Sequence, residues 1–302
     1  MTVRQWTTLA VLALLAATAE AQQQDFSKVE IKTQQVAGNV YMLTGAGGNI
    51  GALVGDDGIL IIDDQFAPLS PKIHEALAKL SPKPVKFLVN THYHGDHTGG
   101  NEIFGREGSI IVAQENVRKR LSERQVIELF KMDNPPAPKE ALPVITFTED
   151  VGLHLDGEDL RVFHVPNAHT DGDSLIYFSK ANVLHAGDTL FNGFYPFIDV
   201  GGGGSINGMI GSADKVLGMI NDDTKIIPGH GPLATPKDLK AFRDMLATVR
   251  DNVAKLVKEG KSADEVVAAQ PAKDVDAVWG KGFLKAEQFV RIVYSDLSRP
   301  GK

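Results

Sequence analysis

The run His92-Tyr93-His94-Gly95-Asp96-His97 constrains the fold of this chain more than any other feature. It follows closely on the apolar segment 85–89, which the pattern predicts to be a buried strand. Four potential metal ligands thus lie within six residues, just beyond the end of that strand. Withdrawing so much polarity from water without a metal ion or ordered water would be costly. The run therefore predicts a metal site rather than a solvated histidine-rich loop.

Three further potential ligands stand just past predicted strands. His169 follows the segment 162–165, Asp188 follows 183–186, and His230 follows 226–227. Loops at one end of a sheet can converge on a single point. Taken alone, Asp188 or His230 is equally well explained as a turn residue. Together with the histidine run, all three are predicted to complete the metal site.

The absence of cysteine limits the chemistry of that site. The 302 residues include no Cys, so no disulfide can form and thiolate ligands are excluded. The ligands must be imidazoles and carboxylates, a set that suits zinc. The formal charge of −7 makes nucleic acid or an anionic membrane surface a poor partner.

The N-terminus carries a three-part pattern. Arg4 precedes a short apolar run at 9–17, and Ala19-Glu20-Ala21 follows it. This pattern predicts a secretory signal at 1–21 that is cleaved after Ala21, and hence a periplasmic or secreted protein. The apolar run is too short for a permanent membrane span.

The rest of the chain alternates strand and helix signals. Strands are predicted at 40–43, 50–54, 58–64, 85–89, 109–112, 174–178, 183–186 and 224–227, with a hairpin at 151–165. Helices are predicted from Ser70-Pro71, over about 116–132, from Thr235-Pro236 and from the capping box at 262–265. Strands precede helices twice, which predicts two β-rich halves with helices on their outer faces in one domain.

These motifs together resemble the metallo-β-lactamase superfamily. The resemblance is carried by HYHGDH followed by TGG, by His169, by Ala-Gly-Asp188 and by Gly-His230-Gly, and it covers about residues 36–235. Asp63 in LIIDD matches the early structural aspartate of that family. The resemblance implies an αββα sandwich formed by residues 22–235. Residues 236–302 are then expected to be a C-terminal helical extension packed on or beside it.

The resemblance also implies two zinc ions, with iron or manganese as alternatives. His92, His94 and His169 would bind one ion, Asp96, His97 and His230 the other, and Asp188 would bridge them. Two such ions, about 3.5 Å apart, would share a hydroxide that attacks an acyl carbonyl. Asp96 would orient this nucleophile and then carry a proton.

The segment after Asp188 is expected to shape a substrate pocket. It is rich in glycine and aromatic residues, and the predicted pocket residues are Phe191, Asn192, Phe194, Tyr195 and Phe197. The glycine-rich hairpin at 45–49 is equally well explained as a flap over the site or as an ordinary turn. His185 is expected in the core or behind the ligands, since the ligand set is already full.

No subfamily pattern fits fully. No Lys or Arg lies between Asp188 and Lys215, whereas thioesterases similar to glyoxalase II use basic residues to hold glutathione. Phe191 stands where the related lactonases carry a tyrosine, and Asp188 lies in the region where well-known zinc β-lactamases carry a cysteine. The first choice is hydrolysis of a small cyclic amide, a β-lactam, with activity that is weak or promiscuous.

The alternatives belong to several classes. A lactonase and a thioesterase of the glyoxalase II type use similar ligands. An iron-dependent persulfide dioxygenase and a non-enzymatic metal-binding partner protein are alternatives of other classes. A nuclease is disfavoured by the acidic charge. The oligomeric state is left open.

Overall fold

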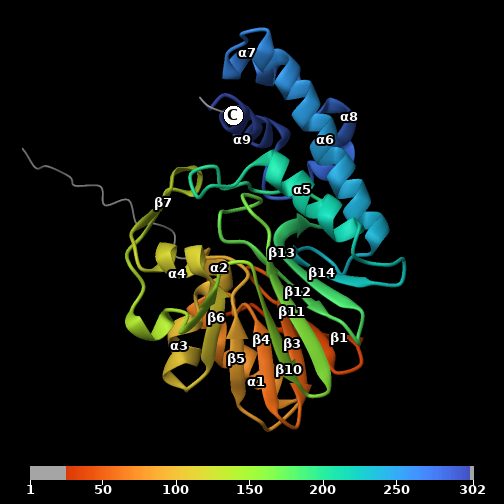
Figure 1. The fold of residues 1–302 in the computed structure, drawn as a ribbon. Coiled ribbons are helices and arrows are strands. Elements are labelled where there is room, and N and C mark those ends of the chain that lie inside the picture. Colours follow the sequence, from red (N-terminus) through yellow and green to blue (C-terminus); the bar gives the residue numbers. More distant parts are fainter. Residues whose placement is uncertain (1–24, 300–302) are drawn as a thin grey trace, which may run out of the picture.

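The computed structural model describes residues 25–299 (Figure 1), so the predicted signal at 1–21 lies outside the described residues. No helix in residues 25–299 has both the length and the apolar character needed to cross a membrane.

The first sheet has seven strands in the order β1-β2-β3-β4-β5-β6-β9. Strands β1 to β4 form an antiparallel meander, whereas β4, β5, β6 and β9 run parallel. The strands are β1 (Lys32–Ala37), β2 (Val40–Thr44), β3 (Ile50–Gly55), β4 (Gly58–Ile62), β5 (Val85–Val89), β6 (Ile110–Gln114) and β9 (Ile145–Phe147). The helices between its parallel strands are α1 (Ser70–Ala78), α2 (Gly95–Thr98), α3 (Asn101–Arg106) and α4 (Glu115–Leu121).

The second sheet has five strands in the order β10-β11-β12-β13-β14, of which only the last pair is parallel. The strands are β10 (Asp150–Leu155), β11 (Glu158–His164), β12 (Ser174–Phe178), β13 (Val183–Phe191) and β14 (Lys225–His230). Helix α5 (Ile206–Leu217) connects β13 to β14, and four helices follow: α6 (Pro236–Lys258), α7 (Ala263–Ala268), α8 (Lys273–Trp279) and α9 (Ala286–Leu297).

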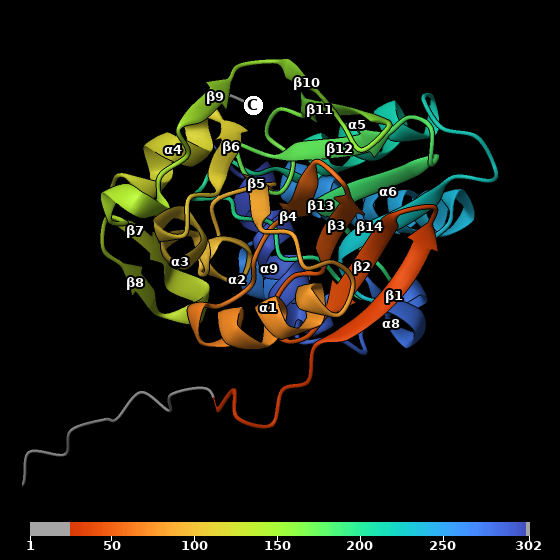
Figure 2. The ribbon, with the colours of Figure 1, turned by 90° about the horizontal axis from the view of Figure 1, so that it is seen from below.

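Three apolar layers hold the sheets and helices together. In β4, Leu60 and Ile62 face the second sheet, whereas Ile59 and Ile61 face the outer helices α1 and α3. Both faces of this strand are therefore buried, which explains its unbroken apolar sequence. The outer face of the second sheet packs against α5, α6 and α9. The layers confirm the αββα sandwich (Figures 1 and 2).

The helix expected over 116–132 is wrong beyond its first turns. Helix α4 ends at Leu121, where Gln125 Nε2 donates to the carbonyl of Arg120 at 3.0 Å. A short hairpin follows, with β7 (Gln125–Ile127) and β8 (Met132–Asn134) joined through a left-handed residue, Lys131 (φ 53°). In this segment Ile127 is buried in the cluster on the outer face of the second sheet, whereas Val126, Leu129 and Phe130 are at least 40% exposed. A continued helix would therefore bury little apolar surface, and tertiary packing supplies most of the stability of a helix in a protein.

Two strands run further than expected, and this matters for the site. Strand β13 continues past Ala186 to Phe191, and β14 continues to His230. Asp188 therefore lies within β13, at an irregular part of its pairing with β14, and His230 is the last residue of β14, whereas loops were expected at both positions. The capping boxes at Thr235 and Ser262 are confirmed as the starts of α6 and α7.

Candidate metal centre

The structure brings all seven predicted ligand side chains together at one edge of the two sheets. His92, His94, Asp96 and His97 follow β5, and His169 follows β11, while Asp188 and His230 come from the neighbouring parallel strands β13 and β14. They form two groups: His92, His94, His169 and Asp188, and Asp96, His97 and His230. Within each group, one ligand atom per residue lies within 4.8 Å of the others.

Hydrogen bonds determine which nitrogen of each histidine faces the first group. Thr91 Oγ1 donates its proton to Asp63 Oδ2 at 2.7 Å, so the Nδ1–H of His92, 3.0 Å away, donates to Thr91 Oγ1. His94 Nε2–H donates to Asp199 Oδ2 at 3.0 Å. His169 Nδ1–H donates to the carbonyl of Phe197 at 2.8 Å.

The three opposite nitrogens therefore point at one another with lone pairs. His94 Nδ1 lies 3.1 Å from His92 Nε2 and 2.9 Å from His169 Nε2. Burial lowers the pKa of His92 well below its usual value and that of His169 to about 4, so both rings are neutral near pH 7. Three converging lone pairs repel one another unless a cation lies between them, and a divalent metal ion fits this donor set.

The second group is held together by Asp188. His97 Nε2 lies 3.1 Å from Asp188 Oδ1, and His230 Nε2 lies 3.3 Å from Asp188 Oδ2 and from Asp96 Oδ2. Burial acts to lower the pKa of His230, but the Asp188 and Asp96 carboxylates together outweigh it and raise the pKa to about 9. Positive charge is therefore favoured here, and a metal ion would replace the protons. Asp188 Oδ2 also lies 3.5 Å from His169 Nε2, so this carboxylate faces both groups.

Two buried carboxylates lie behind the histidines. Asp63 accepts from Thr91 and from His97 Nδ1, which is 2.7 Å from Asp63 Oδ2. This aspartate lies just past β4 in a left-handed conformation (φ 62°). Asp199 accepts from the Tyr93 hydroxyl, His94 Nε2 and the Gly202 amide. The sequence motifs did not single out Asp199. The sequence feature that could have indicated it is an acidic residue in the otherwise apolar stretch after Asp188.

The glycine-rich hairpin at 45–49 packs directly on the centre. A Cβ on Gly48 would lie 2.1 Å from Cε1 of His97, so no larger residue fits there. Gly48 N–H donates to the Asp96 carbonyl at 3.1 Å. Asn49 Nδ2 donates to the carbonyls of Pro228 and Gly231, each at 2.9 Å. The hairpin suggested as a flap is thus tied to both halves of the site.

The aromatic segment after Asp188 contributes two rings that touch the ligands. Phe191 stacks on His230, with ring centroids 5.0 Å apart and an interplanar angle of 21°. Phe197 lies 5.8 Å from both His94 and His169. Phe194 packs on the edge of Phe191 at 5.8 Å.

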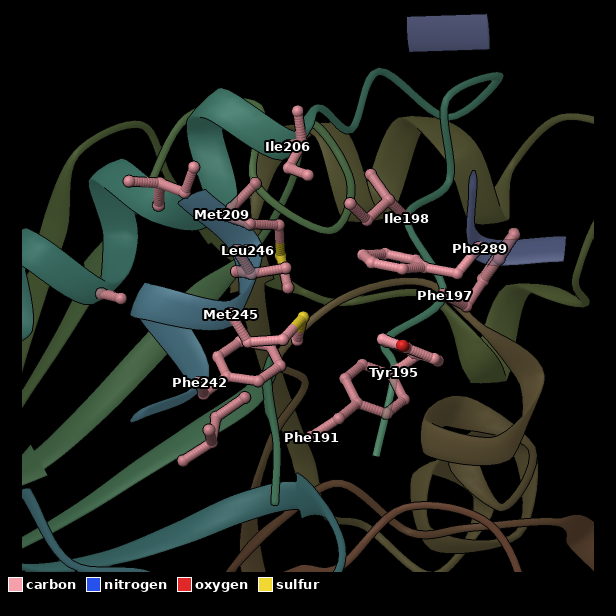
Figure 3. Packing of buried hydrophobic residues seen from close by; sticks show 14 of the residues in the cluster. Phe191, Tyr195, Phe197, Ile198, Ile206, Met209, Phe242, Met245, Leu246 and Phe289 are labelled. Atoms are coloured by element: carbon pink, nitrogen blue, oxygen red, sulfur yellow. The ribbon is translucent and has the colours of Figure 1, made fainter. Parts of the chain in front are cut away.

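Two predicted pocket residues point elsewhere. Tyr195 is fully buried and stacks on Phe289 at 4.7 Å, in the core between the loop and the C-terminal helices (Figure 3). Asn192 Nδ2 donates to the carbonyl of Pro232 at 3.0 Å, which occupies its amide. The core cluster on the outer face of the second sheet extends to this loop and includes Phe191, Tyr195 and Phe197, of which Tyr195 has no ring contact with a predicted ligand within the described residues.

Comparisons with known proteins agree with this geometry. Residues 37–230 match the family model of the metallo-beta-lactamase superfamily. The chain is 27% identical over 205 residues to the 2,4-dinitroanisole O-demethylase subunit alpha of Nocardioides sp. (strain JS1661), covering 66% of this chain and 57% of the relative. It is 26% identical over 148 residues to the hydroxyacylglutathione hydrolase of Pelagibacter ubique (strain HTCC1062), covering 48% and 52%. The chain thus spans about half the length of these curated relatives.

Solved structures show the same fold. The DIM-1 metallo-beta-lactamase superposes with a TM-score of 0.58 at 19% identity, covering 73% of this chain and 99% of that one. The sec-alkylsulfatase Pisa1 from Pseudomonas sp. superposes with a TM-score of 0.65 at 20% identity, covering 88% and 50%. Because the family model matches more than half of its residues and the sandwich is the same, this chain belongs to the metallo-beta-lactamase superfamily.

Proposed function

We propose that this chain is a metal-dependent hydrolase that adds water to an acyl carbonyl. The observation that carries the proposal is that the ring nitrogens of His92 and His169 both lie within 3.1 Å of His94 Nδ1. A second group, Asp96, His97 and His230, lies beside them, and Asp188 faces both groups. His92, His94 and His169 would hold one metal ion, and Asp96, His97 and His230 a second. We propose zinc as the native metal. Two such ions, when bound, would supply Lewis acidity and a water that ionises near neutral pH.

The residues of the chain position the reacting groups. Asp63 and Asp199 fix the orientation and tautomer of His97 and His94. The side chains of Asp96 and His230 are 27% and 20% exposed, whereas the other ligand side chains are almost fully buried. Substrate would therefore approach from the side of Asp96 and His230. Asp96 is the carboxylate at this opening that can take up a proton from the attacking water.

The proposed substrate is a small cyclic acyl compound, with a β-lactam as the first choice. The chain is 23% identical over 189 residues to the metallo-beta-lactamase type 2 of Bacteroides fragilis, which supports this choice. Among residues 25–299, however, the seven ligand side chains form ion pairs only with one another, Asp63 and Asp199. In this part of the chain no Lys or Arg pairs with a predicted ligand side chain, which supports weak turnover of a β-lactam with its carboxylate and favours a neutral lactone as second candidate.

The test is an activity panel on protein of measured metal content. The purified chain is expected to contain about two zinc ions and to hydrolyse nitrocefin slowly, and a chelator should abolish both properties. Lactones, thioesters and sulfate esters form the rest of the panel, and Asp96→Asn is the inactive control. Lactone turnover far above nitrocefin turnover would overturn the first choice. Bound iron with persulfide-dependent oxygen uptake would identify a dioxygenase instead.

The absence of activity on this panel would be decided by the metal content of the protein. If the chain binds no metal, and added zinc, iron or manganese produces no hydrolysis on the panel, the enzyme proposal fails. Metal binding without any turnover would leave a metal-binding partner protein.

We also propose that the chain is exported. The support is the three-part pattern of Arg4, the apolar run 9–17 and Ala19-Glu20-Ala21. Intact-mass measurement of the protein from its native host is expected to give a chain that begins at Gln22. A protein of full length in the cytoplasmic fraction would contradict this.

A further inference from the structure

Two exposed phenylalanine rings meet beside the metal centre. Phe130, in the connection between β7 and β8, is 40% exposed, and Phe283, in the connection between α8 and α9, is 51% exposed. About 150 residues separate them in the chain, yet their ring centroids lie 6.3 Å apart. Figure 1 shows the β7 hairpin reaching towards the C-terminal helices. Large apolar side chains exposed as a pair beside a candidate metal centre indicate contact with a ligand.

The exposed pair connects to the metal-binding histidines through one buried ring on each side. Phe130 packs on Phe197 at 4.8 Å, and Phe197 touches His94 and His169 at 5.8 Å. Phe283 packs on Phe191 at 6.2 Å, and Phe191 stacks on His230 at 5.0 Å. The four phenylalanines therefore form a continuous aromatic wall from the ligands to the surface.

The surroundings of the wall determine what it can bind. Within residues 25–299, no Lys or Arg forms an ion pair with a predicted ligand side chain. Two arginines line the cavity beside Phe197, and both have other partners: Arg291 pairs with Asp264 and Glu287, and Arg299 donates to the Val200 carbonyl. Phenyl rings offer apolar area and edge or face contacts to another ring. The wall thus suits an aromatic or bulky alkyl group without charge.

We propose that Phe130 and Phe283 are specificity residues that hold an uncharged aryl or bulky alkyl arm of the substrate. The inference rests on the proposed function, because the scissile carbonyl must lie at the metal centre while the arm lies along the wall. It names a substrate class that the histidine and aspartate ligands do not define. Each ring that the arm covers contributes roughly tenfold in affinity.

The test separates the arm from the reacting group. Calorimetry compares acetohydroxamic acid with 3-phenylpropanohydroxamic acid on the zinc-loaded chain, because the two share a metal-binding head and differ in the arm. Kinetics compares p-nitrophenyl acetate with p-nitrophenyl 3-phenylpropanoate in the same way. The variants are Phe130→Ala, Phe283→Ala and the double variant. Val278→Ala is the control, since this apolar residue on α8 is 58% exposed and is not part of the aromatic wall.

The wild-type chain is expected to bind the phenylpropano compound at least tenfold more tightly than the acetyl one. The double variant should lose this preference and keep its affinity for acetohydroxamic acid within twofold, while Val278→Ala resembles the wild type. Replacing both phenylalanines by leucine should restore part of the preference. Equal binding of the two compounds by the wild type would overturn the proposal, as would an equal loss for both in the double variant.

Two outcomes distinguish this proposal from the proposed function. Retained hydroxamate preference with no ester hydrolysis would overturn the hydrolase and support the wall. Hydrolysis of both esters without preference would overturn the wall alone. The exposed rings could instead bind a second copy of the chain. A dimer that dissociates in the double variant, with both hydroxamate affinities unchanged, would replace the proposal.

Discussion

At the scale of single residues, the centre depends on what lies behind each histidine. Each of His92, His94, His97 and His169 has its outer nitrogen in a hydrogen bond, and Asp63 and Asp199 receive two of these bonds directly. Such a bond selects the tautomer and fixes the ring before a metal arrives. The affinity of the site is therefore determined in part by residues that never touch the metal.

Asp199→Asn tests this dependence. The amide keeps the shape of the side chain but removes the charge that faces the Nε2–H of His94. We expect zinc affinity to fall about 10- to 100-fold, measured by competition with a chromophoric chelator. Asp171→Asn is the matched control, because Asp171 pairs with Arg120 and not with a ligand. Unchanged affinity in Asp199→Asn would contradict a positioning role.

The buried ring of His185 predicts a pH dependence of stability. Its Nε2–H donates to the carbonyl of Asn49 at 3.1 Å, and its Nδ1 accepts from the Gly187 amide at 3.2 Å. Burial lowers the pKa of His185 to about 4, from about 6.5 in an unfolded chain. The unfolded chain therefore binds the proton first as pH falls, so stability present above pH 6.5 is lost towards pH 4.

His185→Gln removes this titration. Between pH 7 and pH 4.5 the metal-free wild type should lose about 2 kcal/mol more unfolding free energy than the variant. Urea unfolding of both proteins in the presence of a chelator measures this difference. If the unfolding free energies of the two proteins changed equally with pH, His185 would not be the group that titrates.

At the scale of elements, the site lies where strand ends and one hairpin meet. The carboxyl ends of β5 and β14 deliver ligands, and Asp188 lies near the carboxyl end of β13. Strands that run parallel in a sheet place such ends at one edge. The hairpin between β2 and β3 then closes on them through Gly48 and Asn49.

Gly48→Ala tests this close approach. The added methyl group would overlap His97, so the hairpin or the imidazole must move. We expect zinc content to fall well below that of the wild type, measured by elemental analysis after dialysis, and activity to fall at least tenfold. Gly95→Ala is the control within the ligand motif itself, because no atom lies within 4 Å of a Cβ there. Equal zinc content in the two variants would show that the hairpin does not hold the site.

At the scale of the whole molecule, the C-terminal helices fix the loop between β13 and α5. Tyr195 stacks on Phe289 of α9, and its amide donates to the carbonyl of Trp279 at 3.0 Å. The Ile206 amide donates to Asp296 Oδ2 at 2.9 Å. Since this loop carries Phe197 and Asp199, the helices support the metal centre from outside.

We therefore expect Phe289→Ala to lower the free energy of unfolding strongly. Phe289 is fully buried in the cluster that joins α9 to the loop, and truncating such a ring costs about 3–5 kcal/mol of unfolding free energy. Urea unfolding of the metal-free chain measures it. Phe283→Ala removes the same ring from a 51% exposed position and should cost much less. Similar losses in both variants would mean that the C-terminal helices do not stabilise the loop.

Much of the site was predictable because the sequence patterns that indicate it each span only a few residues. The histidine run follows its strand directly, and capping boxes and turn residues act within a few positions. Asp63, the seven side chains that gather at the candidate site, the hairpins and the helix starts at Thr235 and Ser262 could therefore be found from local patterns and from the resemblance they carry. The same patterns failed at 122–132, where a continued helix was predicted and a short hairpin with one buried side chain, Ile127, forms instead.

What the sequence determined by itself was the kind of candidate site: imidazole and carboxylate groups that could bind a metal ion, at the ends of buried strands in a layered fold. Only the tertiary structure decided that Asp199 faces His94, that Tyr195 belongs to the core, and that Phe130 meets Phe283. These contacts join segments about 90 to 150 residues apart. The physical reason is that a strand or a cap forms from neighbouring residues. Which side chains share a buried space depends instead on how whole layers pack.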